Sequence, residues 1–358
     1  MARNTNNSIL HKAKESKSDE FYTQYCDIES ELMHYTNQFK GKIVYCNCDN
    51  PLKSNFFRFF VKNFHVLGLK KLISACYQKS DNPIFDMEQS KGYYVVYEGQ
   101  TYEKFEEIYN NIRYFQGDGD FRSTESKKIL MDCDVVVTNP PFSLFREFVA
   151  TIMRCQKEFL IIGNINAITY KEIFELIQNN KIWLGHNLGR GISGFIVPDH
   201  YELYGTEARI NENGERIVSS NNCLWLTNLE SPLRNEFIRL TKVYKGNESE
   251  YPVFDNYDAI NVNRTQDIPM DFTGAMGVPI TFLHKYNPKQ FEIIKFRKGN
   301  DGKDLSIGGK CPYFRILIRN LQLPLSDSKV QDITYARHDV KKNKPQSSIG
   351  DVIQLSLF

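Results

Sequence analysis

The sequence has no apolar run that approaches the roughly 18 to 20 residues needed to cross a membrane as a helix. Its first twenty residues also lack the apolar segment of a signal peptide. None of the eight cysteines forms a C-x-x-C pair, and the seven histidines follow no metal-binding spacing. These absences argue against a membrane protein, a secreted disulfide scaffold and a metal site. We therefore expect a cytoplasmic protein with reduced cysteines and no bound metal.

The composition is that of an ordinary globular protein. The chain has 358 residues, 41% of them hydrophobic and 25% charged, which is enough for two domains with sizeable cores. Residues 1–18 are polar, and we expect them to form a flexible N-terminal arm.

The charge is unevenly distributed along the chain. The net charge is only +2, but residues 281–345 hold fourteen Lys and Arg against six Asp and Glu. A basic C-terminal region on an otherwise acidic chain favours a polyanionic partner such as nucleic acid. The alternative interpretation is a solvated basic surface without a partner.

The first half of the chain alternates between two patterns. Apolar, β-branched stretches typical of buried strands lie at 41–47, 70–77, 133–139 and 157–164. Stretches with helical spacing follow them at 52–68, 143–156 and 169–181. This alternation predicts an α/β domain with a parallel sheet and helices on both faces. After about residue 186, short strand candidates separated by Gly and polar residues predict a second, mostly β region.

The stretch DVVVTNPPFSLF ends a predicted strand in an unusual way. Pro140 and Pro141 each fix a φ angle and lack an N–H donor, so Asn139 and the Pro140 carbonyl offer mainly acceptors. A rigid pair of acceptors beside the ring of Phe142 suits a flat aromatic amine. In an open α/β sheet this turn lies at the strand ends where ligands bind. The alternative is an ordinary helix N-terminus with Ser143 as its cap.

The segment Asn139-Pro140-Pro141-Phe142 resembles the (D/N)-P-P-(Y/F) motif of amino-methyltransferases. These enzymes use S-adenosylmethionine to methylate the N6 amine of adenine, the N4 amine of cytosine or a glutamine amide. The resemblance implies that these four residues are catalytic.

Two further stretches resemble cofactor motifs of this family. Tyr22, Thr23 and Gln24 match an aromatic-Thr segment that reaches the methionine part of the cofactor. In FQGDGDFRS, Asp120 and Phe121, with Asp118 close by, match the residues that hold its adenine ring. A turn of Gly and Asp on a solvated surface is the alternative for the second stretch.

The first strand departs from the usual pattern, because its cofactor motif lacks the glycines that let the backbone approach a ligand. The segment has Cys46, Asn47, Cys48 and Asp49 instead, as in methyltransferases similar to the EcoRI modification enzyme. The resemblance implies that Cys46, Asn47 and Asp49 bind the cofactor. Asn139 is expected to contact it as well.

Taken in order, these motifs make the chain similar to the EcoRI-type adenine-specific DNA methyltransferases. The resemblance implies a Rossmann-like S-adenosylmethionine-dependent core at 19–185 and a mixed, mostly β, target-recognition region at 186–358. It implies methylation of adenine N6 in duplex DNA by base flipping, a GAATTC-like site, a monomer and a cognate restriction endonuclease as genetic partner. Candidates for reading bases, by composition only, are Arg190, Arg209, Arg216, Arg264, Arg297 and Lys298.

Several alternatives remain open from the sequence. The enzyme could methylate cytosine N4, an RNA adenine or a protein glutamine, although a protein substrate gives no reason for the basic C-terminal region. A noncatalytic nucleic-acid-binding protein on a methyltransferase fold would explain the missing glycines. A nucleotide-dependent oxidoreductase would share the sheet, but no G-x-G-x-x-G fingerprint follows the first strand.

Overall fold

A computed structural model describes residues 22–78, 91–187, 192–198, 208–211, 214–219, 222–297, 305–312 and 314–322. The arm expected at 1–18 lies outside these residues. The chain divides into two compact units, one of Met1–Ile238 with Ile280–Pro288 and one of Arg239–Pro279 with Lys289–Phe358. The first unit therefore extends past residue 185. Which residues recognise the target stays a prediction.

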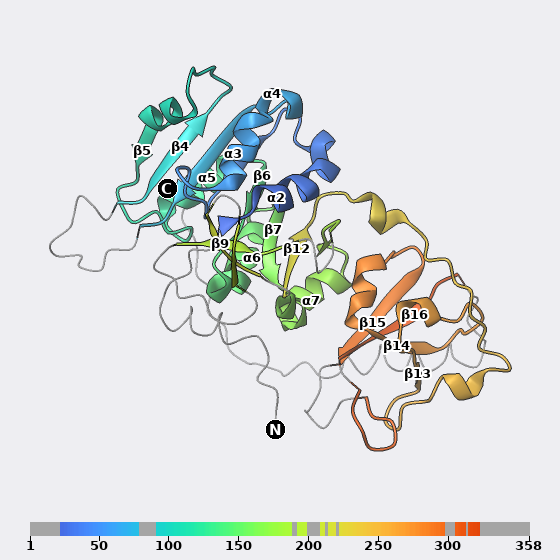
Figure 1. Cartoon of the computed structure of the whole chain (residues 1–358). Coiled ribbons are helices and arrows are strands. Elements are labelled where there is room, and N and C mark those ends of the chain that lie inside the picture. The colour runs from blue at the N-terminus through green and yellow to red at the C-terminus, as the bar shows by residue number, and fades with distance from the viewer. Residues whose placement is uncertain are drawn as a thin grey trace, which may run out of the picture. The chain divides into compact units, whose positions relative to one another are not determined.

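The first unit is built on an eight-stranded sheet in the order β5-β4-β3-β2-β6-β7-β12-β8 (Figure 1). The central strands run parallel, namely β3 (Lys71–Cys76), β2 (Ile43–Cys46), β6 (Val135–Thr138) and β7 (Glu158–Asn164). Each of the four lies within a stretch predicted to be a strand. The expectation of a parallel sheet is thus confirmed for the centre of the sheet.

The edges of this sheet are antiparallel, which the sequence pattern did not predict. They contain β4 (Tyr93–Tyr97) and β5 (Ile112–Tyr114) on one side, and β12 (Cys223–Thr227) and β8 (Trp183–Leu184) on the other. Strand β12 pairs with β7 although some 60 residues of chain separate them. Such a long-range insertion leaves no signal in local periodicity.

Helices cover both faces of the sheet, as expected. They are α2 (Tyr25–Leu32), α3 (Asn55–Lys62), α4 (Phe64–Leu67), α5 (Thr124–Asp132), α6 (Phe145–Arg154) and α7 (Lys171–Gln178). Apolar residues of α2 and α3 share a core with Val44, Val135 and Leu160. Because side chains alternate along a strand, neighbouring residues face the other side. There Gly163 of β7 leaves room for the Phe145 ring of α6.

Local sequence explains why α3 begins where it does. The Ser54 hydroxyl accepts the N–H groups of Phe56 and Phe57, which caps the helix. Its phenylalanines at spacings of one, three and four residues are buried in the core. After α4 the chain turns at Gly68, whose φ of 63° suits a residue without a Cβ.

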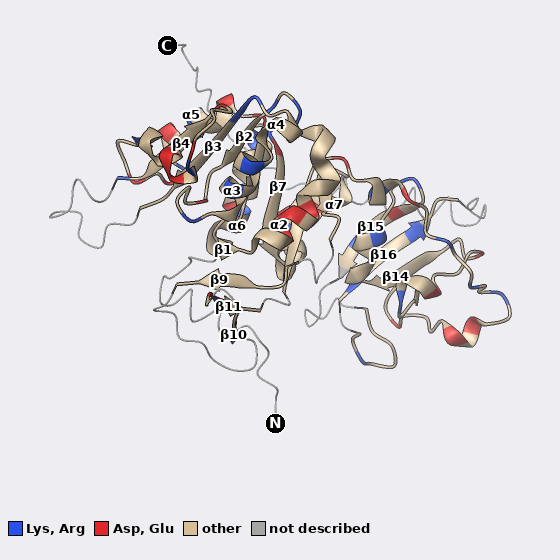
Figure 2. Ribbon diagram, turned by 45° about the horizontal axis from the view of Figure 1, so that its top comes forward, with Lys and Arg blue, Asp and Glu red and all other residues tan. Residues whose placement is uncertain are grey.

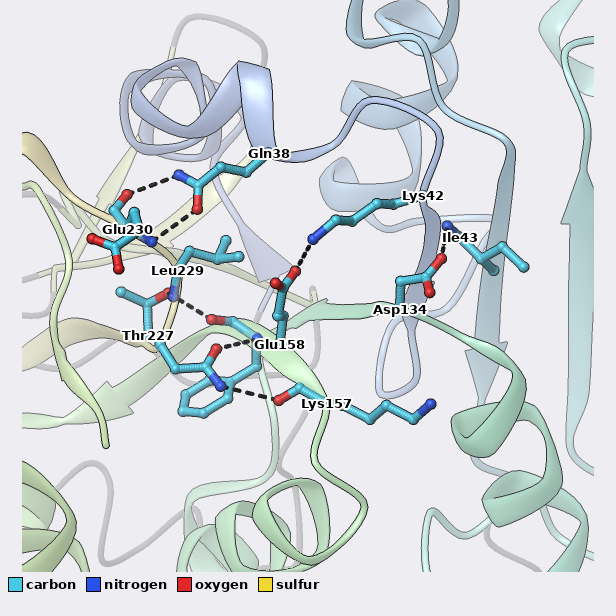
Figure 3. Close-up of polar contacts among 11 residues, drawn as sticks. Gln38, Lys42, Ile43, Asp134, Lys157, Glu158, Thr227, Leu229 and Glu230 are labelled. Carbon is cyan, nitrogen blue, oxygen red and sulfur yellow. Dashed lines mark hydrogen bonds and ion pairs between the residues drawn. The ribbon is translucent and has the colours of Figure 1, made fainter. Parts of the chain in front are cut away.

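Polar contacts fix the strands at their amino-terminal edge (Figure 3). The carboxylate of Asp134 accepts the Ile43 N–H at 2.8 Å and so ties β6 to β2. Lys42 forms an ion pair with Glu158 at the start of β7. The Asn228 side chain accepts the Phe159 N–H and donates to the Lys157 carbonyl, which joins the end of β12 to β7.

A second, four-stranded sheet in the first unit has the order β1-β9-β11-β10. Its strands are β1 (Tyr22–Thr23), β9 (Phe195–Val197), β11 (Arg216–Val218) and β10 (Ala208–Ile210). All its pairings are antiparallel. Residues from the N-terminal segment therefore pair directly with residues from beyond position 186.

The second unit is a small mixed sheet around its own core. Its strands are β13 (Ala259–Asn261), β14 (Ala275–Pro279), β16 (Arg315–Asn320) and β15 (Phe291–Arg297), in that order. Phe254, Leu305 and Leu317 pack together on it. Strands β15 and β16 carry four Lys or Arg against one acidic residue. Figure 2 colours basic residues blue and acidic residues red.

Short 3-10 helices complete the chain. They are η1 (Met33–Gln38), η2 (Phe105–Asn111), η3 (Phe142–Leu144), η4 (Ile165–Thr169), η5 (Pro232–Asn235), η6 (Glu248–Glu250), η7 (Thr265–Asp267) and η8 (Ile280–Lys285). One of the short strand candidates beyond residue 186, GVPITFLHKY at 277–286, is a strand only as far as Pro279, and η8 follows it with Phe282 and Leu283 buried. Apolar content alone did not distinguish the two conformations.

Candidate active site

The candidate site lies at the carboxyl ends of β2 and β6. Asn47 to Asp49 follow β2, and Asn139 to Phe142 follow β6. The two strands are parallel neighbours, so both loops leave the sheet at the same edge. The chain continues from β2 to β3 on one side, whereas β6 lies on the other. This is the topological switch point at which open α/β sheets bind ligands.

A buried carboxylate joins the two loops. Thr138 donates its hydroxyl to Asp49 Oδ2 at 2.5 Å, and Ser54 donates to Oδ1 at 2.9 Å. The backbone N–H of Asn139 also donates to this carboxylate. Asp49 is 7% exposed. Loss of hydration outweighs these donors and raises the pKa of Asp49 to about 6.

The Asn-Pro-Pro-Phe segment is a rigid turn between β6 and α6. Pro140 is buried, and Pro141 is extended, with φ of −60° and ψ of 123°. The Pro141 carbonyl accepts the Leu144 N–H at 3.0 Å. Leu144 is the N-cap residue of α6 and makes no side-chain cap bond, so a helix capped by Ser143 is not what this segment forms.

Phe142 is half-buried and packs against the core beneath it. Its ring meets the ring of Phe195 edge-on, with 6.3 Å between centroids. Phe195 lies on β9 and pairs with Thr23 of β1. The predicted stacking ring and the predicted cofactor segment are thus held by the same strand.

The segment of Tyr22, Thr23 and Gln24 is fastened on both sides. The Gln24 amide donates to the Ser193 hydroxyl at 2.5 Å and to the Gly194 carbonyl at 3.1 Å. On the other side, Asn55 of α3 donates to the Thr23 carbonyl at 2.9 Å. The segment therefore lies between the β9 strand and the beginning of α3.

Two buried oxygens stand out in this region. Neither Thr23 Oγ1 nor Asn47 Oδ1 has a hydrogen-bond partner among the described residues. Their side chains are 3% and 5% exposed. Leaving a buried polar atom unpaired costs about 1–3 kcal/mol. Such atoms are suited to polar groups of a ligand, and the donor set of S-adenosylmethionine fits them.

Asp120 is already engaged within the protein. Its Oδ1 accepts the backbone N–H and Nε of Arg122 at 2.8 and 2.9 Å, and its Oδ2 accepts Nη2 at 2.6 Å. Arg122 lowers the pKa of Asp120, which keeps it charged. A carboxylate has about four lone-pair sites, so Oδ2 retains room for one more donor.

The neighbours of Asp120 have different environments. Asp118 is exposed, and its carboxylate accepts the Asp120 N–H at 3.0 Å. Phe121 is buried and packs edge-on against Phe148 of α6 at 5.1 Å. Asp118 and Phe121 therefore shape the loop that presents Asp120.

The cysteines of the first cofactor motif are uncharged. Burial, with the nearby charge of Asp49, raises the pKa of both the Cys46 and the Cys48 thiols. Cys46 is completely buried in the core, whereas Cys48 also feels the charge of Asp120. The charge of Asp120 acts on the Cys48 thiol because the loop after β2 lies near that carboxylate. Cys46 has no surface to offer a ligand.

The sequence reasoning missed Tyr77, an aromatic residue at the end of β3. It is 49% exposed, and burial together with the charges of Asp118 and Asp120 raises the pKa of its hydroxyl. Its position at the carboxyl end of a predicted strand was a usable signal. Thr138 and Ser54, which hold Asp49, were also missed, because only the fold brings them together.

The candidate base readers are scattered in the chain. Arg216 lies on β11 and Arg209 on β10 of the first unit, and Arg264 precedes η7 in the second unit. Arg190, Lys298 and the side chain of Arg297 lie outside the described residues. Their role in recognition stays a prediction.

The described residues contain neither a candidate metal centre nor a candidate membrane-spanning helix. No group of three or more His, Cys, Asp or Glu there is arranged to hold a metal ion. Within the same residues, no helix has both the length and the apolar character needed to cross a bilayer.

Comparisons with known proteins agree with the geometry. Residues 9–343 match the family model of the adenine-specific methyltransferase EcoRI. The chain is 63% identical over 326 residues to Type II methyltransferase M.EcoRI of Escherichia coli, covering 90% of this chain and 99% of that protein.

Two mycoplasma proteins are also similar. M.MgeORF184P of Mycoplasma genitalium is 37% identical over 332 residues, covering 88% of this chain and 99% of its own. M.MpnI of Mycoplasma pneumoniae is 35% identical over 331 residues, covering 87% and 98%. Both are named Type II methyltransferases. No solved structure matches the chain.

Proposed function

The chain belongs to the EcoRI family of adenine-specific methyltransferases, and from this premise we propose that it transfers the methyl group of S-adenosylmethionine to the N6 amine of adenine at specific sites in duplex DNA. The observation that carries the proposal is the Asn139-Pro140-Pro141-Phe142 turn at the switch point of the sheet. A hydrogen-bonded carboxylate joins this turn to the loop after β2.

The proposed acceptor chemistry follows from the turn. The adenine amine is a poor nucleophile because its lone pair is delocalised into the ring. The Asn139 side chain and the Pro140 carbonyl would accept its two N–H groups and localise that lone pair. Phe142 would stack on the base. Transfer is then a direct displacement in which positioning supplies most of the rate enhancement, and the proton leaves to solvent.

The base must leave the duplex first. Unstacking and unpairing cost a few kcal/mol, which binding to the rest of the DNA offsets. The half-buried ring of Phe142, supported by Phe195, offers a surface on which the flipped base is stacked. Stacking on an aromatic side chain contributes roughly 1–3 kcal/mol.

The residues present fit S-adenosylmethionine, which supplies an electrophilic methyl group when bound. Thr23 Oγ1 and Asn47 Oδ1 would accept from its polar groups. The free lone pair of Asp120 Oδ2 would accept its adenine amine, and Tyr77 would flank the ring. These roles are supported by the buried unpaired oxygens and by the placement of Asp120 near the β2 loop.

We further propose that residues from 186 onwards recognise the target. In the first unit, the β9–β11 strands would contribute to recognition. In the second unit, Lys and Arg of β15 and β16 would contact phosphates. The enzyme would act as a monomer, and a cognate restriction endonuclease would be its genetic partner. The names of the relatives, Type II methyltransferases, support the last point.

The test uses substrates of different class in parallel. Purified protein receives labelled S-adenosylmethionine and either duplex DNA containing GAATTC, the same duplex with that site scrambled, or duplex RNA of the same sequence. Label in the first DNA alone supports the proposal. Label in RNA alone would replace DNA as the substrate. Absence of label from all three nucleic acids would overturn the proposed reaction.

A further inference from the structure

The Asp49 side chain lies where several elements end. Its carboxylate receives donors from Ser54, the cap of α3, and from Thr138, the last residue of β6. Its backbone is pinned to β3, since its N–H donates to the Ala75 carbonyl at 3.1 Å and its carbonyl accepts the Ser74 hydroxyl at 2.6 Å. One residue thus connects the ends of β2, β3 and β6 with the beginning of α3.

The orientation of its oxygens separates Asp49 from Asn47. Both Asp49 oxygens accept from protein donors, and the side chain is 7% exposed. The oxygen of Asn47, two residues earlier, is buried without a partner among the described residues. A ligand entering this loop would therefore meet Asn47, whereas Asp49 faces the protein.

The Asp49 carboxylate also accepts the backbone N–H of Asn139, and this hydrogen bond affects the residues that follow. A hydrogen bond to this N–H fixes the peptide plane that precedes Asn139. The next two residues are prolines, whose φ angles are locked near −65°. The orientation set at Asn139 is therefore transmitted to the Pro140 carbonyl and to Phe142 with little freedom to relax.

We infer that Asp49 is a positioning residue: its carboxylate holds the Asn-Pro-Pro-Phe turn in register with the loop after β2. This inference rests on the proposed methyl transfer and assigns Asp49 a role other than contact with the cofactor. Thr138 acts together with Asp49. Its hydroxyl donates to the Asp49 carboxylate and accepts the Cys48 N–H at 3.2 Å, so it links the end of β6 to the loop after β2.

The experiment compares three variants with a matched control. Asp49→Asn keeps the shape but exchanges one acceptor for a donor. Thr138→Val removes the hydroxyl, and Thr138→Ser keeps it. In the control, Asp134→Asn removes an aspartate that ties the same two strands together at their opposite ends. For each protein we would measure kcat, KM for DNA and the Kd of S-adenosylmethionine by calorimetry.

We expect kcat to fall roughly 10- to 100-fold in Asp49→Asn and Thr138→Val, since small misplacements of reacting groups have effects of that size. The Kd of S-adenosylmethionine should change less than about 3-fold. In the double variant Asp49→Asn/Thr138→Val, kcat should fall by less than the product of the two single reductions. Thr138→Ser and Asp134→Asn should keep kcat within about 2-fold. If Asp49→Asn does not fold, the Thr138 pair decides the matter.

Two results would overturn the inference. One is a tenfold weaker Kd with unchanged kcat in Asp49→Asn, as expected of a cofactor ligand. The other is additive losses in the double variant. If the wild type transfers no methyl group, the proposed function fails instead. The contact between Asp49 and Thr138 is then tested by denaturant midpoints. If the shift in the double variant equals the sum of the shifts for Asp49→Asn and Thr138→Val, the two residues do not act together and the positioning role is refuted.

Discussion

Phe142 and Phe195 meet edge-on with their ring centroids 6.3 Å apart. One residue follows the central strand β6 and the other lies on β9 of the smaller sheet. Since β9 also pairs with β1, the proposed base-stacking ring and the proposed cofactor segment share one support. A change at Phe195, which is buried in the core, should therefore disturb both the stacking ring and the cofactor segment.

The first prediction concerns the ring of Phe142. Phe142→Leu retains an apolar side chain but removes the π-face, so kcat/KM on duplex DNA should fall about tenfold, equivalent to about 1.4 kcal/mol of lost stacking. The loss should be smaller when the target adenine is mispaired, because such a base leaves the stack more easily. Phe237→Leu is the control, since Phe237 is 55% exposed and takes no part in the site. Equal losses in both variants would refute the role.

The second prediction concerns the unpaired oxygen of Thr23. Thr23→Val removes a hydroxyl that lacks a partner among the described residues, so the unliganded protein should be as stable as the wild type or more so. The Kd of S-adenosylmethionine should rise roughly 5- to 10-fold. Thr151→Val is the comparison, because the Thr151 hydroxyl donates to the Glu147 carbonyl within α6. A lower unfolding midpoint with an unchanged Kd for Thr23→Val would indicate a purely structural hydroxyl.

The third prediction follows from the pKa of Asp49. It is about 6 in the folded protein, against 3.8 for an ordinary Asp. Between those values the folded state holds a proton that the unfolded state lacks, so the free energy of unfolding decreases as pH rises from about 4 to 6. Asp49→Asn cannot titrate, and the stability of the wild type relative to it should fall by on the order of 2 kcal/mol over this window. Denaturant titrations from pH 4 to 7.5 measure this difference.

Activity should show the opposite trend with pH. The charged carboxylate accepts all its donors, whereas the protonated form must turn one oxygen into a donor. Methyl transfer should therefore rise to a plateau above about pH 6. In the denaturant titrations, a difference in stability between the wild type and Asp49→Asn that stays constant from pH 4 to 6 would contradict the raised pKa of Asp49.

The fourth prediction concerns Gly119, between the two aspartates of the cofactor loop. Its φ is +79°, and a Cβ there would lie 2.8 Å from the Cys76 carbonyl oxygen, which is backbone and cannot easily move. Gly119→Ala should therefore cost roughly 1–3 kcal/mol of stability and displace Asp120. We expect a weaker Kd for S-adenosylmethionine as well. Gly246→Ala is the control, with a similar φ of +83° and open space around the position.

Much of this architecture could be predicted from local sequence. The strands at β2, β3, β6 and β7 have continuous apolar runs, and α3 and α6 have helical spacing, so their periodicity was sufficient. The motif residues could be placed at strand ends for the same reason. What could not be predicted depends on distant pairings. β12 joins the sheet beside β7 from residue 223 onwards. β1 has only two residues and forms a strand by pairing with β9.

Within the site, too, local contacts could be predicted from the sequence, whereas contacts between distant residues could not. Residue type suggested that both Asn47 and Asp49 face the cofactor. Their difference depends on Thr138, whose proximity to Asp49 arises from the pairing of β2 with β6. The bonding of Asp120 to Arg122 is by contrast local, two residues apart, and an Asp-x-Arg turn could have indicated it.

The most direct test of the central claim is the identity of the methylated nucleoside. Duplex DNA containing GAATTC would be incubated with S-adenosylmethionine and either the wild type or Asn139→Ala, then digested and analysed by mass spectrometry. We expect N6-methyladenine with the wild type and at least a hundredfold less with the variant, while both bind DNA with similar Kd. N4-methylcytosine in place of N6-methyladenine, or an Asn139→Ala variant as active as the wild type, would contradict the proposed chemistry.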